Sequence, residues 1–211
     1  MTLVLASASA VRLSLLKGAG LSVVAKPAAI DEAAIKAAAR AEAADVADTA
    51  LLLAEMKARR VARAAPAALV IGADQILVQG GEWFDKPADL AAAAKQLRRL
   101  AGVWHELVTA VVCWRGDAVL WRHVARPRLR MRPLSDAALA AYLAAEGERV
   151  LSSVGAYRLE GPGIQLFEAI DGEYFSILGL PLLPLLGFLR QHFGCEWLSA
   201  TTGEETSLPP P

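Results

Sequence analysis

Short apolar runs bounded by glycine or polar residues predict the first strands of this chain. Residues 2–6 and 21–25 are apolar and too short for helices, and residues 68–72 and 75–79 follow the same pattern. A turn is predicted directly after them at Gln79-Gly80-Gly81-Glu82. The N-terminal part of the chain is therefore expected to supply several buried strands.

A second kind of strand signal follows in the middle of the chain. Apolar and polar residues alternate over 104–114 and 117–131, on either side of Arg115-Gly116-Asp117. Alternation on both sides of a glycine-containing turn predicts a long hairpin. Residues 163–178 predict two more short strands, joined at Asp171-Gly172.

Apolar residues at helical spacing predict the helices. Asp48 is the expected N-cap of an alanine-rich helix, and Pro87 is expected to open another, since proline suits the first helical position. The first helix carries Arg12 and is stopped by Gly18 or Gly20. The expected helices cover residues 12–18 or 12–20, 32–47, 49–65, 87–100, 135–146 and 182–192.

Helices and strands are mixed without a strict β-α-β rhythm, which predicts an α/β fold with a mixed sheet. No internal repeat and no linker divides the chain, so residues 1–199 are expected to form a single domain. Residues 200–211, which end in three prolines, are expected to form a disordered tail.

Composition and charge narrow the class of protein. Hydrophobic residues make up 55% of the chain, enough for a sizeable core, so disorder over most of the length is excluded. The 22 basic and 22 acidic residues cancel, whereas a nucleic-acid-binding protein usually carries a basic surplus. The helix with Arg59, Arg60 and Arg63 is the only candidate nucleic-acid surface, and we expect no nucleic-acid partner.

The cysteines and the apolar segments point to the cytoplasm. Cys113 and Cys195 form no CxxC pattern, which argues against a zinc site or disulfide framework and favours a reducing compartment. The N-terminus lacks the basic region of a signal peptide. The leucine-rich stretch 175–189 is too short for a membrane span and carries Pro181 and Pro184, so no membrane association is expected.

The first strand leads into a candidate phosphate site. Ser7 and Ser9 lie in the loop before a helix, whose N-terminus exposes free N–H groups and a partial positive charge. Arg12 lies about one turn into that helix, and because helical side chains lean toward the N-terminus, its guanidinium can reach the same anion. An N-capping serine and a surface arginine are the common structural alternative.

Two carboxylates are candidate metal ligands or general bases. Asp31-Glu32 opens a helix, and Asp74 is predicted to follow an apolar strand in Gly72-Ala73-Asp74-Gln75. A carboxylate at the end of a buried strand needs a cap, a charge partner or a metal. Carboxylate oxygens suit Mg²⁺ or Mn²⁺, and the chain has no histidine cluster that would favour zinc. A turn aspartate and a first-turn helix glutamate remain alternatives.

Two lysines complete the candidate site. Lys57 lies in a predicted helix, and Lys86 precedes Pro87, which favours an extended backbone and a fixed direction for the lysine. A lysine ammonium suits phosphate oxygens, although a solvated surface lysine is common. The sequence contains neither a GxxxxGK[ST] nor a GxGxxG phosphate loop, and no GxSxG nucleophile motif.

In combination, these residues resemble the Maf family, in the branch common in alphaproteobacteria. The resemblance covers residues 3–190, and no single segment carries it. The matching residues, in order, are Leu5-Ala6-Ser7-Ala8-Ser9, Arg12, Leu15-Leu16, Asp31-Glu32, Leu53-Ala54, Lys57-Ala58, Gly72-Ala73-Asp74-Gln75, Lys86-Pro87, Leu97, Leu100, Gly102, His105, Thr109, Gly155-Ala156-Tyr157 and Gly179-Leu180-Pro181-Leu182.

The resemblance implies a fold and an activity. The fold would be an elongated mixed sheet with two lobes and a central cleft, similar to the inosine-triphosphate pyrophosphatases. The activity would be hydrolysis of a nucleoside triphosphate to the monophosphate and pyrophosphate with Mg²⁺, Mn²⁺ or Co²⁺, in a house-cleaning role. Family substrates are dTTP and UTP, 7-methyl-GTP, or modified nucleotides. A homodimer is also implied.

Residue roles follow from the same resemblance. Asp74 is the expected catalytic acid-base group and Glu32 the metal-linked glutamate, although either could be base or metal ligand. Lys57 and Lys86, with the substrate-binding Ser7, Ser9 and Arg12, would contact phosphates. Gln75 and Glu160 complete the expected substrate-binding set.

Two departures from the family pattern stand out. The adjacent arginines common at the first helix are replaced by Val11-Arg12-Leu13. The common Gly-Ala-Tyr-x-Ile-Gln-Gly becomes Gly155-Ala156-Tyr157-Arg158-Leu159-Glu160-Gly161, so a glutamate replaces the family glutamine, or Gln165 substitutes for it. The base preference therefore stays open. The rival hypothesis is a nucleotide-binding regulator of septum formation without catalysis, against which the intact Glu32, Lys57, Asp74 and Lys86 set argues.

Overall fold

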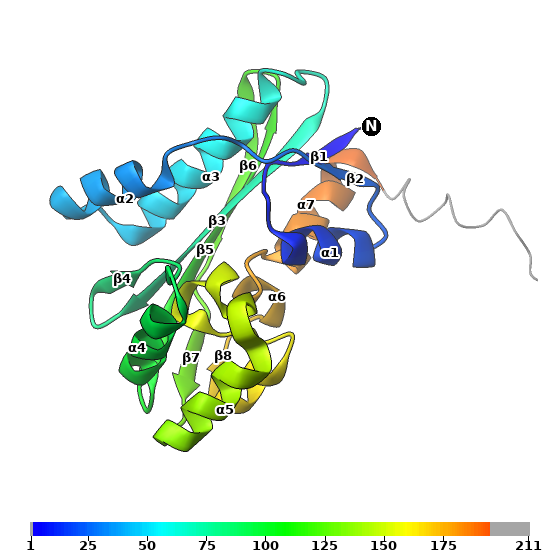
Figure 1. The fold of residues 1–211 in the computed structure, drawn as a ribbon. Coiled ribbons are helices and arrows are strands. Elements are labelled where there is room, and N and C mark those ends of the chain that lie inside the picture. The colour runs from blue at the N-terminus through cyan, green and yellow to red at the C-terminus, as the bar shows by residue number, and fades with distance from the viewer. Residues whose placement is uncertain (1, 195–211) are drawn as a thin grey trace, which may run out of the picture.

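A computed structural model describes residues 2–194, and the strands within this range form one eight-stranded mixed sheet (Figure 1). The strand order is β2-β1-β3-β5-β7-β8, with β4 paired to β3 and β6 paired to β5. The pairs β1–β2 and β1–β3 are parallel, and the others are antiparallel. The strands are β1 (Leu3–Leu5), β2 (Val23–Ala25), β3 (Leu69–Gln79), β4 (Glu82–Phe84), β5 (Trp104–Arg115), β6 (Ala118–Ala125), β7 (Arg128–Met131) and β8 (Phe167–Asp171). The predicted α/β fold with a mixed sheet is confirmed.

Helices cover both faces of this sheet. They are α1 (Ala10–Gly18), α2 (Glu32–Ala41), α3 (Val46–Ala62), α4 (Leu90–Leu100), α5 (Asp136–Glu146), α6 (Tyr174–Ile177) and α7 (Leu182–Phe193), with 3₁₀ turns η1 (Gly147–Ser152), η2 (Val154–Ala156) and η3 (Pro162–Leu166). Among the residues described, no helix is long and apolar enough to cross a membrane.

Strand alternation divides the first half of the sheet between two hydrophobic clusters. Leu69 and Ile71 of β3 face one side, where they pack with residues of α1 and α7. Val70, between them, faces the other side and packs with residues of α3. Because successive side chains of a strand point to opposite faces, one buried strand anchors helices on both.

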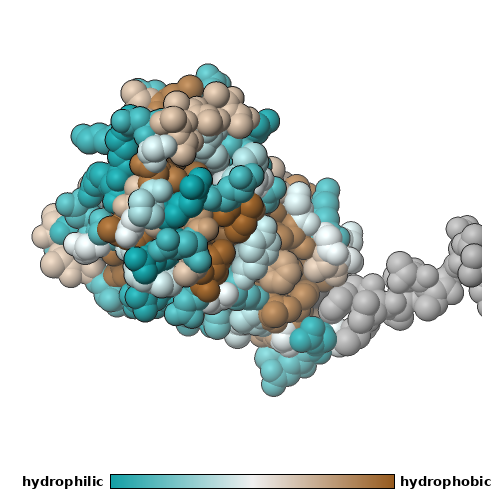
Figure 2. Space-filling view, turned by 90° about the horizontal axis from the view of Figure 1, so that it is seen from below, coloured by the Kyte–Doolittle hydropathy of each residue, from teal (hydrophilic) through white to brown (hydrophobic). Residues whose placement is uncertain are grey.

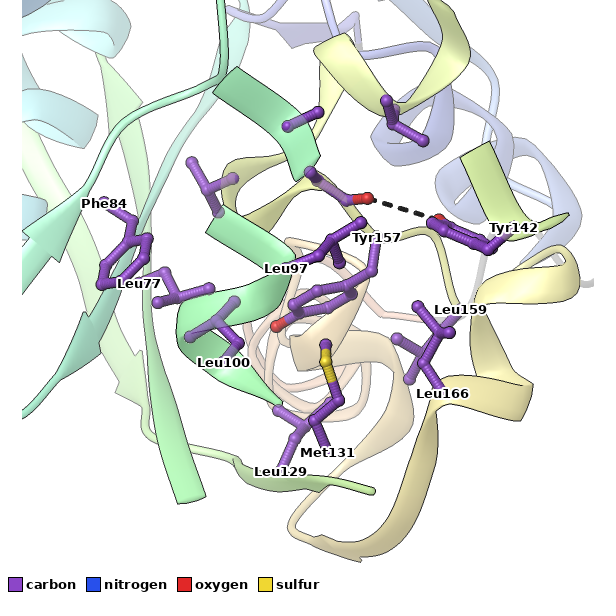
Figure 3. Close-up of a cluster of buried hydrophobic side chains, with 14 of the residues drawn as sticks. Leu77, Phe84, Leu97, Leu100, Leu129, Met131, Tyr142, Tyr157, Leu159 and Leu166 are labelled. Carbon is purple, nitrogen blue, oxygen red and sulfur yellow. Dashed lines mark hydrogen bonds between the residues drawn. The ribbon is translucent and has the colours of Figure 1, made fainter. Parts of the chain in front are cut away.

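The second half of β3 enters a separate core, which forms the other lobe (Figure 3). Leu77 of β3 packs there with Leu97 and Leu100 of α4, with Tyr142 of α5 and with Tyr157. Tyr142 donates a hydrogen bond to the carbonyl oxygen of Ala156 at 3.3 Å, drawn as the dashed line in Figure 3. The long strands β3 and β5 therefore join two lobes, each with its own core.

Several predicted boundaries were wrong for local reasons. Asp45, not Asp48, caps α3, since its carboxylate accepts from the N–H groups of Ala47 and Asp48. The helix predicted to begin at Pro87 begins at Leu90 with Asp89 as its N-cap. Both cases follow from the preference of aspartate for the N-cap position, where its side chain satisfies free N–H groups.

Three strand predictions also changed. The segments 68–72 and 75–79 form one continuous strand, β3, so Asp74 lies inside a strand and not at its end. The return strand 117–131 is interrupted before Arg128 and splits into β6 and β7, with Pro127, which has no N–H to donate, in the gap. Of the two strands predicted within 163–178 only β8 forms, while η3 precedes it and α6 follows it. The expected tail from residue 200 lies outside the described residues.

Candidate active site

A cleft of about 830 Å³ lies between the two lobes, alongside the middle of β3. Its walls come from the loop before α1, from α2 and α3, from the loop before α4 and from the η1–η3 region. All nine residues predicted to form the site line it, namely Ser7, Ser9, Arg12, Glu32, Lys57, Asp74, Gln75, Lys86 and Glu160. The structure thus brings the predicted residues together, while their individual roles stay predictions.

The loop between β1 and α1 is closed by its own serines. The Ser9 side chain caps α1 by accepting from the N–H of Arg12 at 3.3 Å, and the Ser7 hydroxyl accepts from the N–H of Ser9 at 3.2 Å. This is the geometry of an N-cap. Ala10 and Val11 of the first helical turn line the cleft. The hydroxyl groups have one hydrogen each left to donate to a ligand.

Arg12 is more deeply built into the protein than its helical position predicts. Its Nε donates to the carbonyl oxygen of Gly179 at 2.7 Å, and Nη1 donates to that of Ala73 at 2.8 Å and to the Ser7 hydroxyl at 3.3 Å. The side chain is 9% exposed. Burial lowers its pKa, against the opposing charges of Asp74 and Glu32, but arginine remains a cation at neutral pH. Arg12 therefore braces α1 against β3 and the Gly179 turn, and only Nη2 makes no hydrogen bond with the described residues.

Lys57 holds the two candidate carboxylates together. Its Nζ lies 2.5 Å from Oδ1 of Asp74 and 2.7 Å from Oε1 of Glu32. Asp74 is 3% exposed, and its second oxygen, Oδ2, is buried without a hydrogen-bond partner among the described residues. Burying such an atom costs free energy unless a ligand, a water molecule or a metal binds to it.

The pKa of Glu32 lies below its usual value. Burial by itself would raise this pKa, but the hydrogen bond and charge of Lys57, with the charges of Lys36 and Lys86, outweigh burial. Glu32 is therefore a carboxylate at neutral pH, and its side chain remains 43% exposed to the cleft. It can accept a ligand through the oxygen that Lys57 does not contact.

Lys86 stands in a cationic environment. Burial lowers its pKa, and the charges of Arg12, Lys57 and Lys36 act in the same direction against Glu32. An anion bound beside these groups would relieve their mutual repulsion. The cleft is therefore electrostatically suited to phosphate groups.

Sequence reasoning missed Lys36, which is 7% exposed and lines the cleft. Its Nζ lies 3.5 Å from Oδ1 of Asp85, and Arg40 of the same helix contacts Oδ2 of Asp85 at 2.8 Å. This connects α2, which carries Glu32, to the segment that carries Lys86. The sequence signal that could have identified Lys36 is its spacing from Glu32, because the two residues are four apart and residues four apart share a helix face.

The amide nitrogen of Gln75 is used inside the protein. Nε2 donates to the Thr109 hydroxyl at 2.8 Å and lies 3.0 and 3.1 Å from the carbonyl oxygens of Ser176 and Ile177. Of the Gln75 amide, only the carbonyl oxygen therefore remains for the predicted contact with substrate. The main role visible in the structure is to fasten β3 to α6.

Glu160 lies at the opposite end of the cleft, where arginines replace lysines. Its Oε1 accepts from Nε of Arg158 at 3.0 Å. Arg149 and Arg158 also line this end, together with Ser152, Ser153 and Val154. No hydrophobic periodicity marks the 3₁₀ turns between Gly147 and Leu166, which explains why only Glu160 and its alternative Gln165 were singled out there. Gln165 does not line the cleft.

The residues present suit a divalent metal bound together with a phosphate ligand. The described residues contain no group of three or more acidic, histidine or cysteine side chains that could enclose an ion. Mg²⁺ is commonly held by one or two carboxylates, water and substrate phosphates, so Asp74 and Glu32 are sufficient. The unpartnered Oδ2 of Asp74 is the protein atom that most needs such a ligand.

These features define an α/β protein with a cation-lined cleft between two lobes. The profile of the family described as Maf-like protein matches residues 2–192, and the chain belongs to the Maf family. The chain is 56% identical over 192 residues to a nucleoside triphosphate pyrophosphatase of Granulibacter bethesdensis, covering 91% of this chain and 98% of the relative.

One further relative carries a more specific name, and one solved structure has a much lower sequence identity. The chain is 53% identical to a 7-methyl-GTP pyrophosphatase of Rhizobium meliloti, covering 90% of this chain and 95% of that protein. A crystal structure of a nucleoside-triphosphatase, dITP/XTP pyrophosphatase, from Mycobacterium abscessus is 13% identical and covers 96% of this chain and 98% of that chain. The TM-score between the two structures is 0.42.

Proposed function

We propose that this protein hydrolyses a nucleoside triphosphate to the nucleoside monophosphate and pyrophosphate, with the help of a divalent metal. The observation that carries the proposal is the group Glu32–Lys57–Asp74, which places a buried carboxylate with a free oxygen beside a cationic cleft wall. The activities for which the Granulibacter and Rhizobium relatives are named agree with it.

The phosphate chain would lie along the end of the cleft formed by α1, α2 and α3. Four cations line this end, Arg12, Lys36, Lys57 and Lys86, against the three carboxylates Glu32, Asp74 and Asp85. This leaves one positive charge, and a divalent metal adds two more, so together they offset most of the negative charge of a triphosphate. Cations fixed in place before the substrate arrives stabilise the charge that develops on the leaving pyrophosphate.

Asp74 would orient the attacking water and accept its proton. Its Oδ1 is held by Lys57, so Oδ2 remains as the free acceptor at a fixed position. Glu32, with one oxygen on Lys57 and a half-exposed carboxylate, would hold the metal. When bound, the metal supplies charge neutralisation at the phosphates and lowers the pKa of a coordinated water.

The opposite end of the cleft would receive the nucleobase. A carboxylate only accepts hydrogen bonds, so Glu160 suits a guanine edge, where two neighbouring N–H donors are presented. Uracil and thymine offer one N–H between two carbonyl oxygens, which a glutamine amide suits better. Methylation at N7 gives guanine a positive charge, which a carboxylate also favours. We therefore propose a guanine-type base, with 7-methyl-GTP as the leading candidate over dTTP and UTP.

The test is a panel of canonical, methylated and deaminated nucleotides with Mg²⁺, Mn²⁺ or Co²⁺, with products separated by chromatography. We expect monophosphate plus pyrophosphate, and the highest kcat/KM among the guanine nucleotides. Diphosphate plus orthophosphate would contradict the mechanism. Binding of nucleotides without any hydrolysis would favour the regulator instead.

A further inference from the structure

We propose that Glu146, a buried carboxylate outside the cleft, acts through Arg158 to fix the position of Glu160 and so controls which nucleobase the cleft accepts. The inference rests on the proposed function, because it assigns a positioning role behind the base-recognising end of that same site. Glu146 is not expected to touch the substrate.

Helix α5 presents two polar groups to the segment that carries Glu160. Tyr142 and Glu146 are four residues apart and share one buried face, with exposures of 6% and 3%. The Tyr142 hydroxyl accepts from the backbone N–H of Arg158 at 3.3 Å. Glu146 accepts from Nη1 of Arg158 at 2.9 Å. The same helix therefore holds both the backbone and the side chain of Arg158.

Arg158 transmits this position to Glu160. While Nη1 donates to Glu146, Nε donates to Oε1 of Glu160 at 3.0 Å. A guanidinium is planar and rigid, so two carboxylates bonded to different nitrogens of one arginine are held at a fixed mutual angle. Oε2 of Glu160 is then the oxygen that remains for the base.

The backbone around Glu160 is packed closely against Glu146 and Arg158, which leaves it little room to shift independently of them. A Cβ on Gly161 would lie 2.9 Å from Oε1 of Glu146, and a Cβ on Gly163 would lie 2.3 Å from the carbonyl oxygen of Arg158. Both glycines allow the segment to fold closely over Glu146 and Arg158. A displacement of Glu146 is therefore expected to move Glu160.

Stability alone does not explain a charge at this place. Burying a carboxylate costs free energy, and a buried ion pair is often no more stabilising than apolar packing of the same volume. The Glu146 side chain is 1% exposed and contacts two arginines, Arg158 at 2.9 Å and Arg149 at 3.3 Å, and both line the cleft. The two arginines that Glu146 contacts therefore belong to the wall of the cleft and not to the hydrophobic core.

The experiment compares Glu146→Gln, Arg158→Lys and Glu160→Gln with the control Glu148→Gln, an exposed carboxylate two residues from Glu146 that lies outside the cleft lining. For each, kcat and KM are measured with 7-methyl-GTP, GTP and UTP in the presence of Mg²⁺. Glu146→Gln should raise KM for the two guanine nucleotides about tenfold, the scale of one charge-assisted hydrogen bond. Its kcat should stay within threefold of wild type, and UTP should be affected least.

A double variant separates positioning from a general structural effect. Because Glu146 acts through Glu160, Glu146→Gln combined with Glu160→Gln should lose no more base discrimination than Glu160→Gln alone. Additive losses, equal losses for all three nucleotides, or wild-type discrimination in Glu146→Gln would overturn the proposal. If Glu146→Gln does not fold, as judged by circular dichroism, Arg158→Lys decides, since this side chain is 22% exposed and keeps its charge. Failure of the wild type to hydrolyse any nucleotide would instead reject the proposed function.

Discussion

Asp74 is a charged residue in the middle of a central strand, paired across the sheet with Ala110. Ala73 and Ile76 beside it on β3 belong to the hydrophobic clusters, and among the described residues Lys57 forms a salt bridge with it. Burial of this pair has a cost that apolar side chains would avoid. A chemical role for the carboxylate accounts for that cost.

Asp74→Asn tests this role directly. The amide keeps the shape of the side chain but loses its charge and its capacity to accept a proton. We expect kcat to fall by about 10²–10⁴, the range typical of a lost general base. Nucleotide affinity, measured on the same sample, should persist, because the cationic wall is unchanged.

Asp117→Asn, in the exposed turn between β5 and β6, is the matched control for this change and should behave as wild type. Turnover within a few-fold of wild type in Asp74→Asn would assign Asp74 a packing role only.

Arg12 combines a structural and a ligand-binding function. Arg12→Ala should raise KM and lower kcat. The activation free energy that corresponds to kcat/KM should rise by about 2–3 kcal/mol, the scale of a charge-assisted hydrogen bond. The substitution should also lower the melting temperature, because the carbonyl oxygens of Ala73 and Gly179 lose their donor. Arg59→Ala, on the exposed face of α3, should change neither quantity. Lower stability with unchanged kinetics would show that Arg12 is a brace without substrate contact.

At the scale of elements, the contact between α3 and β3 sets the geometry of the site. Lys57 lies on α3 and Asp74 on β3, so their separation depends on how closely the helix approaches the strand. Gly72 makes this approach possible, since a Cβ there would lie 2.1 Å from the carbonyl oxygen of Ala54 and 2.9 Å from Cβ of Ala58. These are backbone and near-backbone atoms that cannot rotate away.

Gly72→Ala should therefore push α3 from the sheet. We expect a loss of about 1–3 kcal/mol in the free energy of unfolding, as for other overpacked cores, measured by urea denaturation. The kcat should fall as well, because Lys57 moves relative to Asp74. Gly18→Ala, at a helical position with no atom within 4 Å of the added Cβ, serves as the control. Equal stabilities for the two variants would contradict the close packing of α3.

At the scale of the whole molecule, the second lobe has a pH-sensitive core. His105 is 3% exposed and contacts the Tyr157 hydroxyl at 2.9 Å through Nε2. Burial raises the pKa of Tyr157, so its hydroxyl remains protonated and is hydrogen-bonded to the neutral imidazole. Burial lowers the pKa of His105 to about 4.

This predicts a loss of stability in mild acid. Above pH 6.5 the imidazole is neutral in both the folded and unfolded chains, while between pH 6.5 and about 4 only the unfolded chain binds a proton. The free energy of unfolding should therefore fall by about 3 kcal/mol from this group as the pH drops through that interval. His105→Gln, whose side-chain amide reaches the position of Nε2 and can still hydrogen-bond with Tyr157, should show a shallower decline in urea denaturation between pH 7 and 4.5. Parallel curves for the two proteins would exclude His105 as the cause.

The assembly and location of the protein remain predictions. Hydrophobic and hydrophilic side chains are intermixed on the face seen in Figure 2. The described residues include exposed large apolar side chains such as Val24 and Leu183, at 53% and 58% exposure. These do not identify a dimer surface. The homodimer, the cytoplasmic location and the absence of a nucleic-acid partner stay as the sequence predicted them.

The sequence by itself determined the mixed α/β class, the main helices and nine of the residues that line the cleft. The reason is that periodicity, capping and composition are local properties of the chain, and a family pattern preserves the order of the residues that meet in a site. The separate elements of 163–178 escaped prediction because short apolar segments fit a strand, a 3₁₀ turn or a short helix equally well.

Only the tertiary structure decided what each site residue touches. The bond from Arg12 to Gly179 spans 167 positions, and those from Arg12 to Ala73 and from Lys57 to Asp74 span 61 and 17. The ion pairs of Glu146 and Asp85 likewise join different elements. Such contacts depend on how helices pack on a sheet, because side-chain partners far apart in sequence leave no periodic signal in either segment.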